Sequence, residues 1–169
     1  MKVCAFEISL LTLAFMLLSC KKEDRSINEA IRGMWKLDKI EAYDDKAASW
    51  NDDTPYANSN GYILYDGMGH MAVHLVPHGY ENFDTSIATD SLPSEEIVAL
   101  MKFYRSNFVY FADYEIGTNT ISHKRLTATE PANWGSVLTR DIEFKGDTLL
   151  LTSKENVFGK KLRLHWIRY

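Results

Sequence analysis

The sequence predicts an all-β protein in which eight antiparallel strands close into a barrel. Three observations lead to this prediction: apolar and polar residues alternate from Gly33 onward, tight-turn sequences separate the alternating segments, and 169 residues suit a single domain. Alternation with period two is typical of strands that bury one face, and closure removes the exposed edges of an open sheet. A two-layer sandwich is the alternative fold.

Three turns set the register of the predicted strands. The turn at 66–69 joins the second and third strands, 118–119 joins the fourth and fifth, and 145–146 joins the sixth and seventh. Each contains glycine or asparagine, which tolerate the positive φ that tight hairpins need. The predicted strands are 33–42, 60–66, 69–76, 108–117, 120–129, 137–144, 147–153 and 161–169.

Two longer segments interrupt the strands. Residues 44–60 are polar and turn-rich, which predicts an exposed loop. Residues 94–105 predict a short helix between the third and fourth strands, with Ser94 as the capping residue. The helix has an apolar side, so we expect it to lie on the barrel as a cover. Tyr80, Phe83 and this helix are candidates for gating a cavity, or for simply covering apolar surface.

The N-terminal segment predicts a targeting signal. Lys2 precedes an apolar run of eleven residues, 8–18, which is shorter than the roughly 20 residues of a membrane-spanning helix. The run ends in Leu-Leu-Ser-Cys at 17–20, which resembles the lipobox of bacterial lipoproteins; in that family the signal is removed and the cysteine is acylated. The resemblance divides the chain into a signal (1–19), a lipidated Cys20 with its tether (20–32) and a barrel (33–169). An ordinary secretory signal or a membrane anchor is the alternative.

A lipidated Cys20 has consequences for chemistry and location. The other cysteine, Cys4, would leave with the signal, so the mature chain would have no disulfide, thiolate nucleophile or cysteine metal site. The segment 21–24, Lys-Lys-Glu-Asp, is similar to the export signal of surface lipoproteins in Bacteroidetes, or else it is a solvated tether. We expect an outer-membrane lipoprotein of the cell envelope, held by its lipid and either periplasmic or surface-exposed. Residues 28–32 predict a helical turn before the barrel.

Several classes of function find no support in the sequence. The net charge of −4 argues against a nucleic-acid partner. His70, His74 and His78 are spaced for a metal on a helix, but on the predicted strand neighbours would be about 13 Å apart. The aspartates in 44–53 lack the spacing of a calcium loop, and no phosphate-binding or nucleophile motif occurs. We therefore expect no metal and no cofactor.

The order of motifs along the chain resembles a known family. Gly33-Met34-Trp35 has the G-x-W form of lipocalins, and the remaining motifs follow the small lipocalin-like proteins of bacteria and fungi over 33–169. The resemblance implies an eight-stranded up-and-down barrel, closed at its base by Arg168 packed over Trp35. It implies no single function. The segments that carry it are 33–37, 61–66, 71–73, 111–115, 121–123, 133–135, Arg140, 146–151 and 164–168.

Strand pairing places four polar side chains inside the barrel. On 137–144 the even positions are mostly apolar, so Arg140 shares the inward face with Leu138, and pairing across 145–146 adds Leu149 and Leu151. On the paired strands 108–117 and 120–129, the register across 118–119 sets Tyr114 opposite His123 and Ala112 opposite Arg125. Unpaired charge is costly to bury, so these arginines need partners.

The inward-facing residues predict a binding protein. We expect a small hydrophobic or amphipathic ligand, oriented by polar groups that favour an anion or carbonyl. A filled, purely structural barrel is the first alternative. An accessory envelope protein is the second; it needs an exposed apolar patch, for which only Tyr65 is a candidate. An isomerase or cyclase is the third, with His123 as general base beside Tyr114 or Arg140. The predicted ligand-binding residues are Trp35, Tyr114, His123, Arg125, Leu138, Arg140, Leu149 and Leu151.

Overall fold

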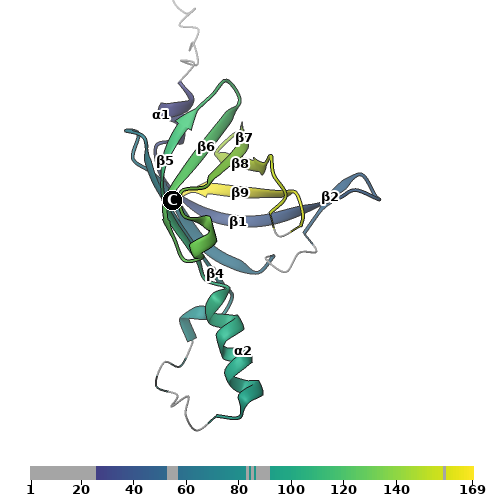
Figure 1. Cartoon of the computed structure of the whole chain (residues 1–169). Helices are drawn as coiled ribbons and strands as arrows, with labels where there is room; N and C mark the ends of the chain where they lie inside the picture. The colour runs from purple at the N-terminus through teal and green to yellow at the C-terminus, as the bar shows by residue number, and fades with distance from the viewer. Residues whose placement is uncertain (1–25, 53–56, 83, 85, 87–91, 158) are drawn as a thin grey trace, which may run out of the picture.

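The computed structural model describes residues 26–52, 57–82, 84, 86, 92–157 and 159–169. The predicted signal, Cys20 and the segment 21–24 therefore lie outside the described residues, as does Phe83. The described residues form nine strands, two α-helices and short 3-10 turns (Figure 1). The helices and strands are α1 (Ile27–Ile31), β1 (Gly33–Asp44), β2 (Ser49–Asn51), β3 (Ser59–Tyr65), β4 (His70–Pro77), α2 (Ser94–Arg105), β5 (Phe108–Ile116), β6 (Thr120–Ala128), β7 (Val137–Lys145), β8 (Thr148–Ser153) and β9 (Leu162–Arg168).

Eight of the strands form a closed antiparallel barrel. The hydrogen-bonded order is β1-β3-β4-β5-β6-β7-β8-β9, and β9 pairs again with β1, which excludes the sandwich. The predicted hairpins are confirmed, with Tyr65 opposite Met71, Ile116 opposite Ile121, and Lys145 opposite Thr148. The inward register is therefore the one that the turns predict.

One end of the barrel is closed by α1, near the top of the barrel in Figure 1. Ser26 caps this helix in a reciprocal capping box with Glu29, and Ile31, the last residue of the helix, is fully buried. The indole Nε1 of Trp35 donates to the carbonyl of Ile31 at 2.7 Å, so the helix is bonded to the start of β1. The helical turn predicted for 28–32 is confirmed, and it plugs the barrel.

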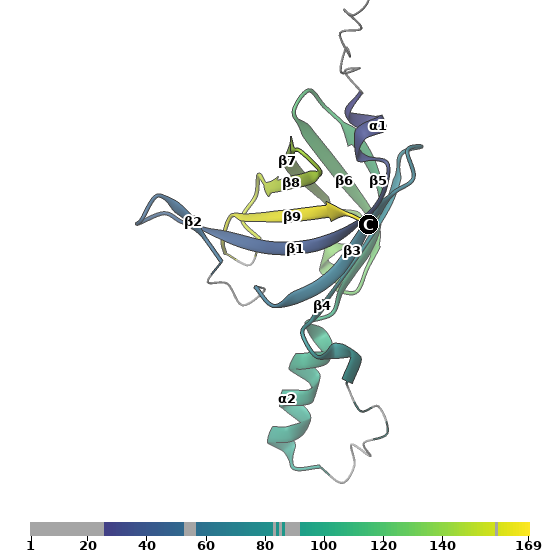
Figure 2. The same cartoon turned by 180° about the vertical axis from the view of Figure 1, so that it is seen from behind.

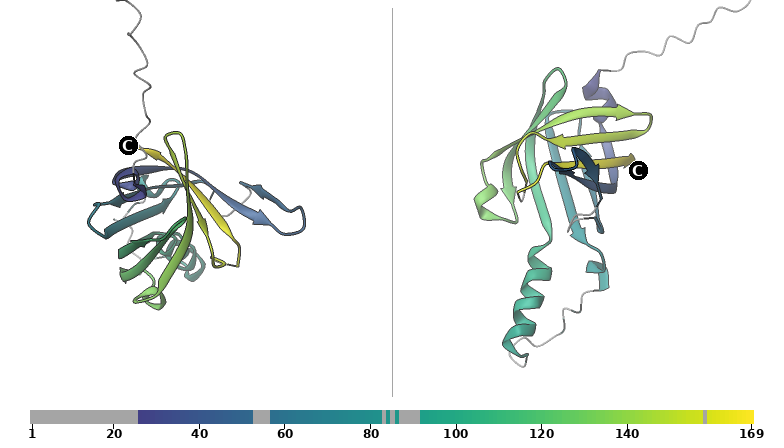
Figure 3. Two further views of the ribbon diagram at one scale, coloured as in Figure 1. Left: turned by 90° about the horizontal axis from the view of Figure 1, so that it is seen from above. Right: turned by 90° about the vertical axis from the view of Figure 1, so that its right-hand side faces the viewer.

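The second helix does not cover the barrel, so this prediction is wrong. From the side, α2 extends beyond the ends of β4 and β5, away from α1 (Figures 1 and 2; Figure 3, right). No residue of α2 is buried, and Val98 and Met101 are each about half exposed. Tyr80 instead stacks on Phe103 at 5.9 Å between ring centroids, so the helix packs on the 3-10 turn Tyr80–Asn82. The residue that caps α2 is Pro93, with no side-chain capping bond, and Ser94 is its first residue.

The segment predicted as a polar loop is also partly a strand. β1 continues to Asp44 and pairs with β2, which forms a short hairpin at the edge of the barrel. Trp50 packs edge-on against Tyr43 at 5.2 Å and lies under Arg163 at 4.3 Å, contacts that the polar composition of 44–60 hides. Among the described helices, none is long and apolar enough to cross a membrane.

Candidate functional site

A cavity of about 620 Å³ occupies the half of the barrel nearest to α2. Such a volume is within the range of small-molecule sites. Its wall comes from inward-facing residues near the ends of the strands, and its rim includes the last turn of α2. The apolar lining residues are Ile40, Leu75, Phe108, Val137, Leu138, Val157, Leu162 and Leu164.

Positive groups outnumber carboxylates around this cavity. Lys102, Arg105, Arg125 and Arg140 line it, against Glu130 and Glu155. At the rim, Arg105 lies 3.6 Å from Glu130 in an exposed ion pair. Glu155 accepts a hydrogen bond from the backbone N–H of Thr139 at 3.3 Å. The cavity therefore has an apolar wall with an excess of cations.

Arg125 is held in the wall by neutral groups. Its Nε donates to Ser136 Oγ at 2.9 Å, and its guanidinium carbon lies 5.8 Å from the centroid of the Tyr110 ring. Burial lowers the pKa of Arg125, and the neighbouring charge of Arg140 lowers it further. Two guanidiniums therefore share one apolar wall.

His123 lies on the α1 side of the cavity, in a layer of hydrogen-bonded rings. Its Nε2 is 3.0 Å from the hydroxyl of Tyr65 and its Nδ1 is 2.9 Å from the hydroxyl of Tyr110. Burial, with the charges of Arg140 and Arg125, lowers its pKa to about 3, so the imidazole is neutral. Both nitrogens are occupied, so this geometry offers no free base for the isomerase or cyclase hypothesis.

The half of the barrel beyond this layer is filled. Trp35 packs on Phe144 at 6.1 Å, and the guanidinium of Arg168 lies 4.1 Å from the Trp35 ring, where the family resemblance placed it. Arg168 also donates to the carbonyls of Arg32 and Ala30 at 2.9 and 2.6 Å, so it bonds the last strand to the α1 segment. This end of the barrel is a structural closure.

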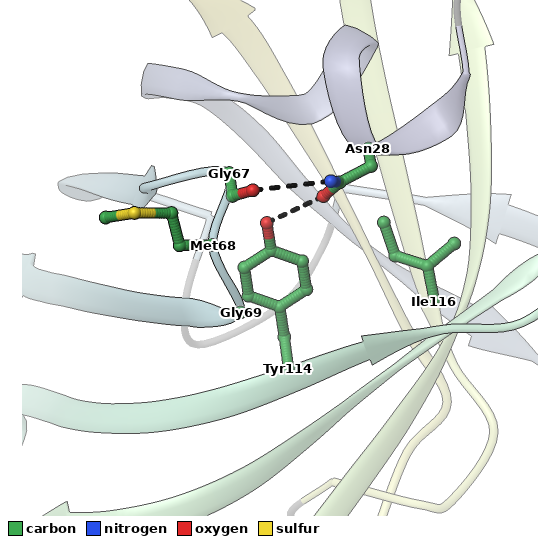
Figure 4. A pocket seen from close by; sticks show the side chains of 6 residues that line it. All are labelled: Asn28, Gly67, Met68, Gly69, Tyr114 and Ile116. Atoms are coloured by element: carbon green, nitrogen blue, oxygen red, sulfur yellow. Dashed lines mark hydrogen bonds between the residues drawn. The ribbon is translucent and has the colours of Figure 1, made fainter.

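A smaller pocket of about 320 Å³ lies at the α1 end (Figure 4). The hydroxyl of Tyr114 donates to Asn28 Oδ1 at 2.9 Å, and Asn28 Nδ2 donates to the carbonyl of Gly67 at 3.3 Å. Its polar side chains are thus bonded to one another and to the turn before β4. The larger cavity is the better candidate site.

The predicted ligand-binding residues divide between these regions. Arg125, Leu138 and Arg140 line the large cavity, and Tyr114 lines the small pocket. Trp35, His123, Leu149 and Leu151 line neither one and belong to the buried interior. The eight predicted residues therefore do not line one cavity, and their role in binding stays a prediction. Inward direction was predicted correctly, but height along the barrel was not.

Sequence reasoning missed much of the cavity wall. Ile40, Leu75, Leu162 and Leu164 line it, yet they were not candidates. The sequence did contain a signal for them. Alternation along each strand places them on the inward face, toward the end of the barrel that lies away from the G-x-W motif. Tyr65 was also misjudged, because it is fully buried against His123 and not part of an exposed patch.

The histidines of β4 serve local contacts. His70 Nδ1 lies 2.7 Å from Asp66, and His74 Nε2 lies 3.1 Å from Asn107 Oδ1. Among the described residues, no group of three or more histidine, cysteine, aspartate or glutamate side chains is placed to hold a metal ion.

A family comparison agrees with this architecture. The model of the lipocalin-like domain matches residues 32–165, which span the whole barrel except the end of β9. The chain belongs to the lipocalin-like domain family. No curated protein and no solved structure matches it. Lipocalin-like barrels are suited to small-molecule binding in general, and the larger cavity of this lipocalin-like chain has the volume for it.

Proposed function

We propose that this protein binds a small, partly apolar molecule in the barrel cavity. The observation that carries the proposal is a cavity of about 620 Å³ with an apolar wall and charged groups at a few positions. Burial of an apolar ligand surface would provide the affinity, and the polar groups would orient the ligand. On the inward face of β7, Arg140 would contact the polar group of such a molecule, and the adjacent Leu138 would contact the apolar part next to it.

Native mass spectrometry of the purified full chain tests this proposal. Cys20→Ala in all samples prevents acylation at that sulfur from adding mass. We expect a reproducible mass excess that disappears on denaturation. Leu138→Trp should abolish it by filling the cavity, whereas Leu126→Trp, on a residue that is half exposed, should leave it unchanged. A clean apo mass that persists after incubation with envelope lipid extract would favour the filled structural barrel.

The proposal includes anchoring in the cell envelope. Cys20 would carry the lipid that holds the protein to the outer membrane, and the segment 21–24 would direct it to the surface. Labelling of cells with an alkyne fatty acid should modify the wild type and not Cys20→Ala. Protease treatment of intact cells should degrade a surface protein and spare a periplasmic one. Acylation of the Cys20→Ala variant would contradict this assignment.

A second function, contact with another envelope protein, is favoured by the outer wall. Met34, Leu64, Ala72 and Phe111 are successive cross-strand neighbours on β1, β3, β4 and β5. Three of them are 38–56% exposed, and Tyr62 and Tyr169 extend the patch with rings 5.3 Å apart. Contiguous exposed apolar surface is typical of interaction sites.

Site-specific photocrosslinking in cells tests the second function. A photoreactive residue at position 64 should give one discrete adduct. The same residue at position 124, where Lys124 is exposed on β6, serves as the control. Equal adducts from both positions would show nonspecific contact and contradict a dedicated interface.

A further inference from the structure

The cavity lining includes a buried cation with an unused hydrogen-bond donor. Arg140 is 6% exposed, and among the described residues its Nη1 has no hydrogen-bond partner. No carboxylate of the described chain lies within ion-pair distance of it. Burial of an unpaired charge costs several kcal/mol, so a protein rarely keeps one without a use for it.

The groups next to Arg140 do not balance its charge. Tyr110 and Tyr65 keep their protons, because burial raises the pKa of both hydroxyls. His123 between them is neutral, and Arg125 adds a second cation. Glu155, a carboxylate of the lining, raises the pKa of Arg125 and so offsets part of that charge, but the four lining cations still outnumber the two lining carboxylates. The site therefore holds positive charge that a bound anion would neutralise.

The position of Arg140 in the barrel sets the orientation of that anion. Along the inward face of β7, Leu138 and Arg140 line the cavity, whereas Ile142 and Phe144 belong to the filled half. Arg140 is therefore the innermost cavity residue of its strand. From there the wall toward the rim is apolar, formed by Ile40, Leu75, Phe108, Leu162 and Leu164.

We propose that the cavity binds an amphiphile with an oxyanion head, in the simplest case a carboxylate, which enters head first and pairs with the guanidinium of Arg140. The apolar tail lies along the wall and ends near the rim between α2 and β7. Charge-assisted hydrogen bonds are short and strong, and they favour an anion over an alcohol with the same tail. This inference rests on the proposed binding function and specifies its ligand class.

Calorimetric titration of the full chain carrying Cys20→Ala tests the proposal. The probes are decanoate, decyl phosphate and decanol, which share a tail and differ in the head. We expect at least one of the two anions to bind about tenfold or more tightly than decanol. The tighter of the two anions identifies the preferred head, and either preference supports the proposal. Arg140→Met should bring the anion down to the affinity of decanol while leaving decanol within about threefold.

Lys124→Met is the control, because it removes an exposed cation of β6 that does not line the cavity. It should change the preference for the anion by less than about twofold. If Lys124→Met removes the preference as fully as Arg140→Met, general attraction by the charge of the protein replaces the specific contact and the proposal fails. If Arg140→Met does not fold, Arg140→Lys takes its place in the test. It keeps the charge, so it should retain part of the preference for the anion.

The wild-type titration separates the two levels of the proposal. Equal affinity for the anions and decanol would overturn the oxyanion head and leave the binding function intact. No binding of any of the three probes would contradict both. These outcomes need only the wild-type barrel, so they do not depend on the stability of any Arg140 variant.

Discussion

The two ends of the barrel differ in how their interior is used. At the α1 end, Trp35, Ile31 and Trp166 are each at most 1% exposed and fill the interior. At the α2 end, Leu138 and Leu164 are also nearly buried, yet they face a cavity of about 620 Å³. His123 and its two tyrosine partners separate the halves. One half maintains the fold, which leaves the other half available for a ligand.

The same substitution in both halves should give the largest difference. Leu149→Ala in the filled half should lower the free energy of unfolding by about 3–4 kcal/mol, because it creates a new void. Leu138→Ala should cost about 1–2 kcal/mol, because its side chain already borders a cavity and has fewer packing partners. Urea denaturation of both variants checks this. Equal losses would mean that the two halves are equally packed.

The layer between the halves should confer acid sensitivity. The pKa of His123 is lowered from 6.5 to about 3 in the folded state, mainly by burial, so its contribution to stability is complete above pH 6.5 and is lost as the pH falls toward 3. We expect the wild type to lose about 4 kcal/mol over this window through His123. His123→Gln, which is less stable at pH 7 but cannot titrate, should show a flatter profile in urea denaturation. An unchanged slope would mean that other groups cause the acid sensitivity.

The sequence predicts the inward face of the barrel well because local rules determine it. A turn such as 145–146 fixes which residues pair, and alternation then fixes which residues point inward. Arg140 opposite Ser153, and Tyr114 opposite His123, follow from two turns and a period of two. Nothing beyond the hairpin is needed for either pair.

The location of the cavity depends on contacts that sequence patterns do not carry. His123 bonds to Tyr65 and Tyr110 on two other strands, and this layer sets where the filled half ends. The amphipathic pattern of α2 shows that it has an apolar side but does not identify the surface that this side contacts. Tyr80, from the turn after β4, takes that place instead of the barrel.

A smaller loss of stability in acid should come from the outer face of the seam, the pairing of β1 with β9 that closes the barrel. Glu41 joins β1 to β9 through Arg163 and His165, at 2.7 and 2.8 Å, and also accepts a bond from Lys39. Burial raises its pKa, but these three hydrogen bonds outweigh burial and hold the pKa at about 2. Its contribution is present above pH 4.5 and is lost as the pH falls toward 2.

Glu41→Gln should therefore cost about 1–2 kcal/mol at pH 7 and less than that near pH 2, where the wild type has lost the same charge. Thermal unfolding at both pH values measures the difference. Glu143→Gln is the control, because its pair with Lys145 is more than half exposed and should contribute little. Equal losses from the two variants would show that the seam gains nothing from its buried carboxylate.

The smallest effect should come from α2, which distinguishes this helix from α1. Val98→Ser combined with Met101→Ser should change the free energy of unfolding by less than about 0.5 kcal/mol, because both side chains are about half exposed and α2 has no buried residue. Ile31→Ala in α1, where the side chain is fully buried, should cost about 2–4 kcal/mol in the same urea titration. A loss above about 1.5 kcal/mol in the α2 variant would show that this helix packs on the barrel. A small loss would mean that α2 is bound to the barrel mainly by its last turn at the cavity rim, where a ligand entering the cavity would pass it.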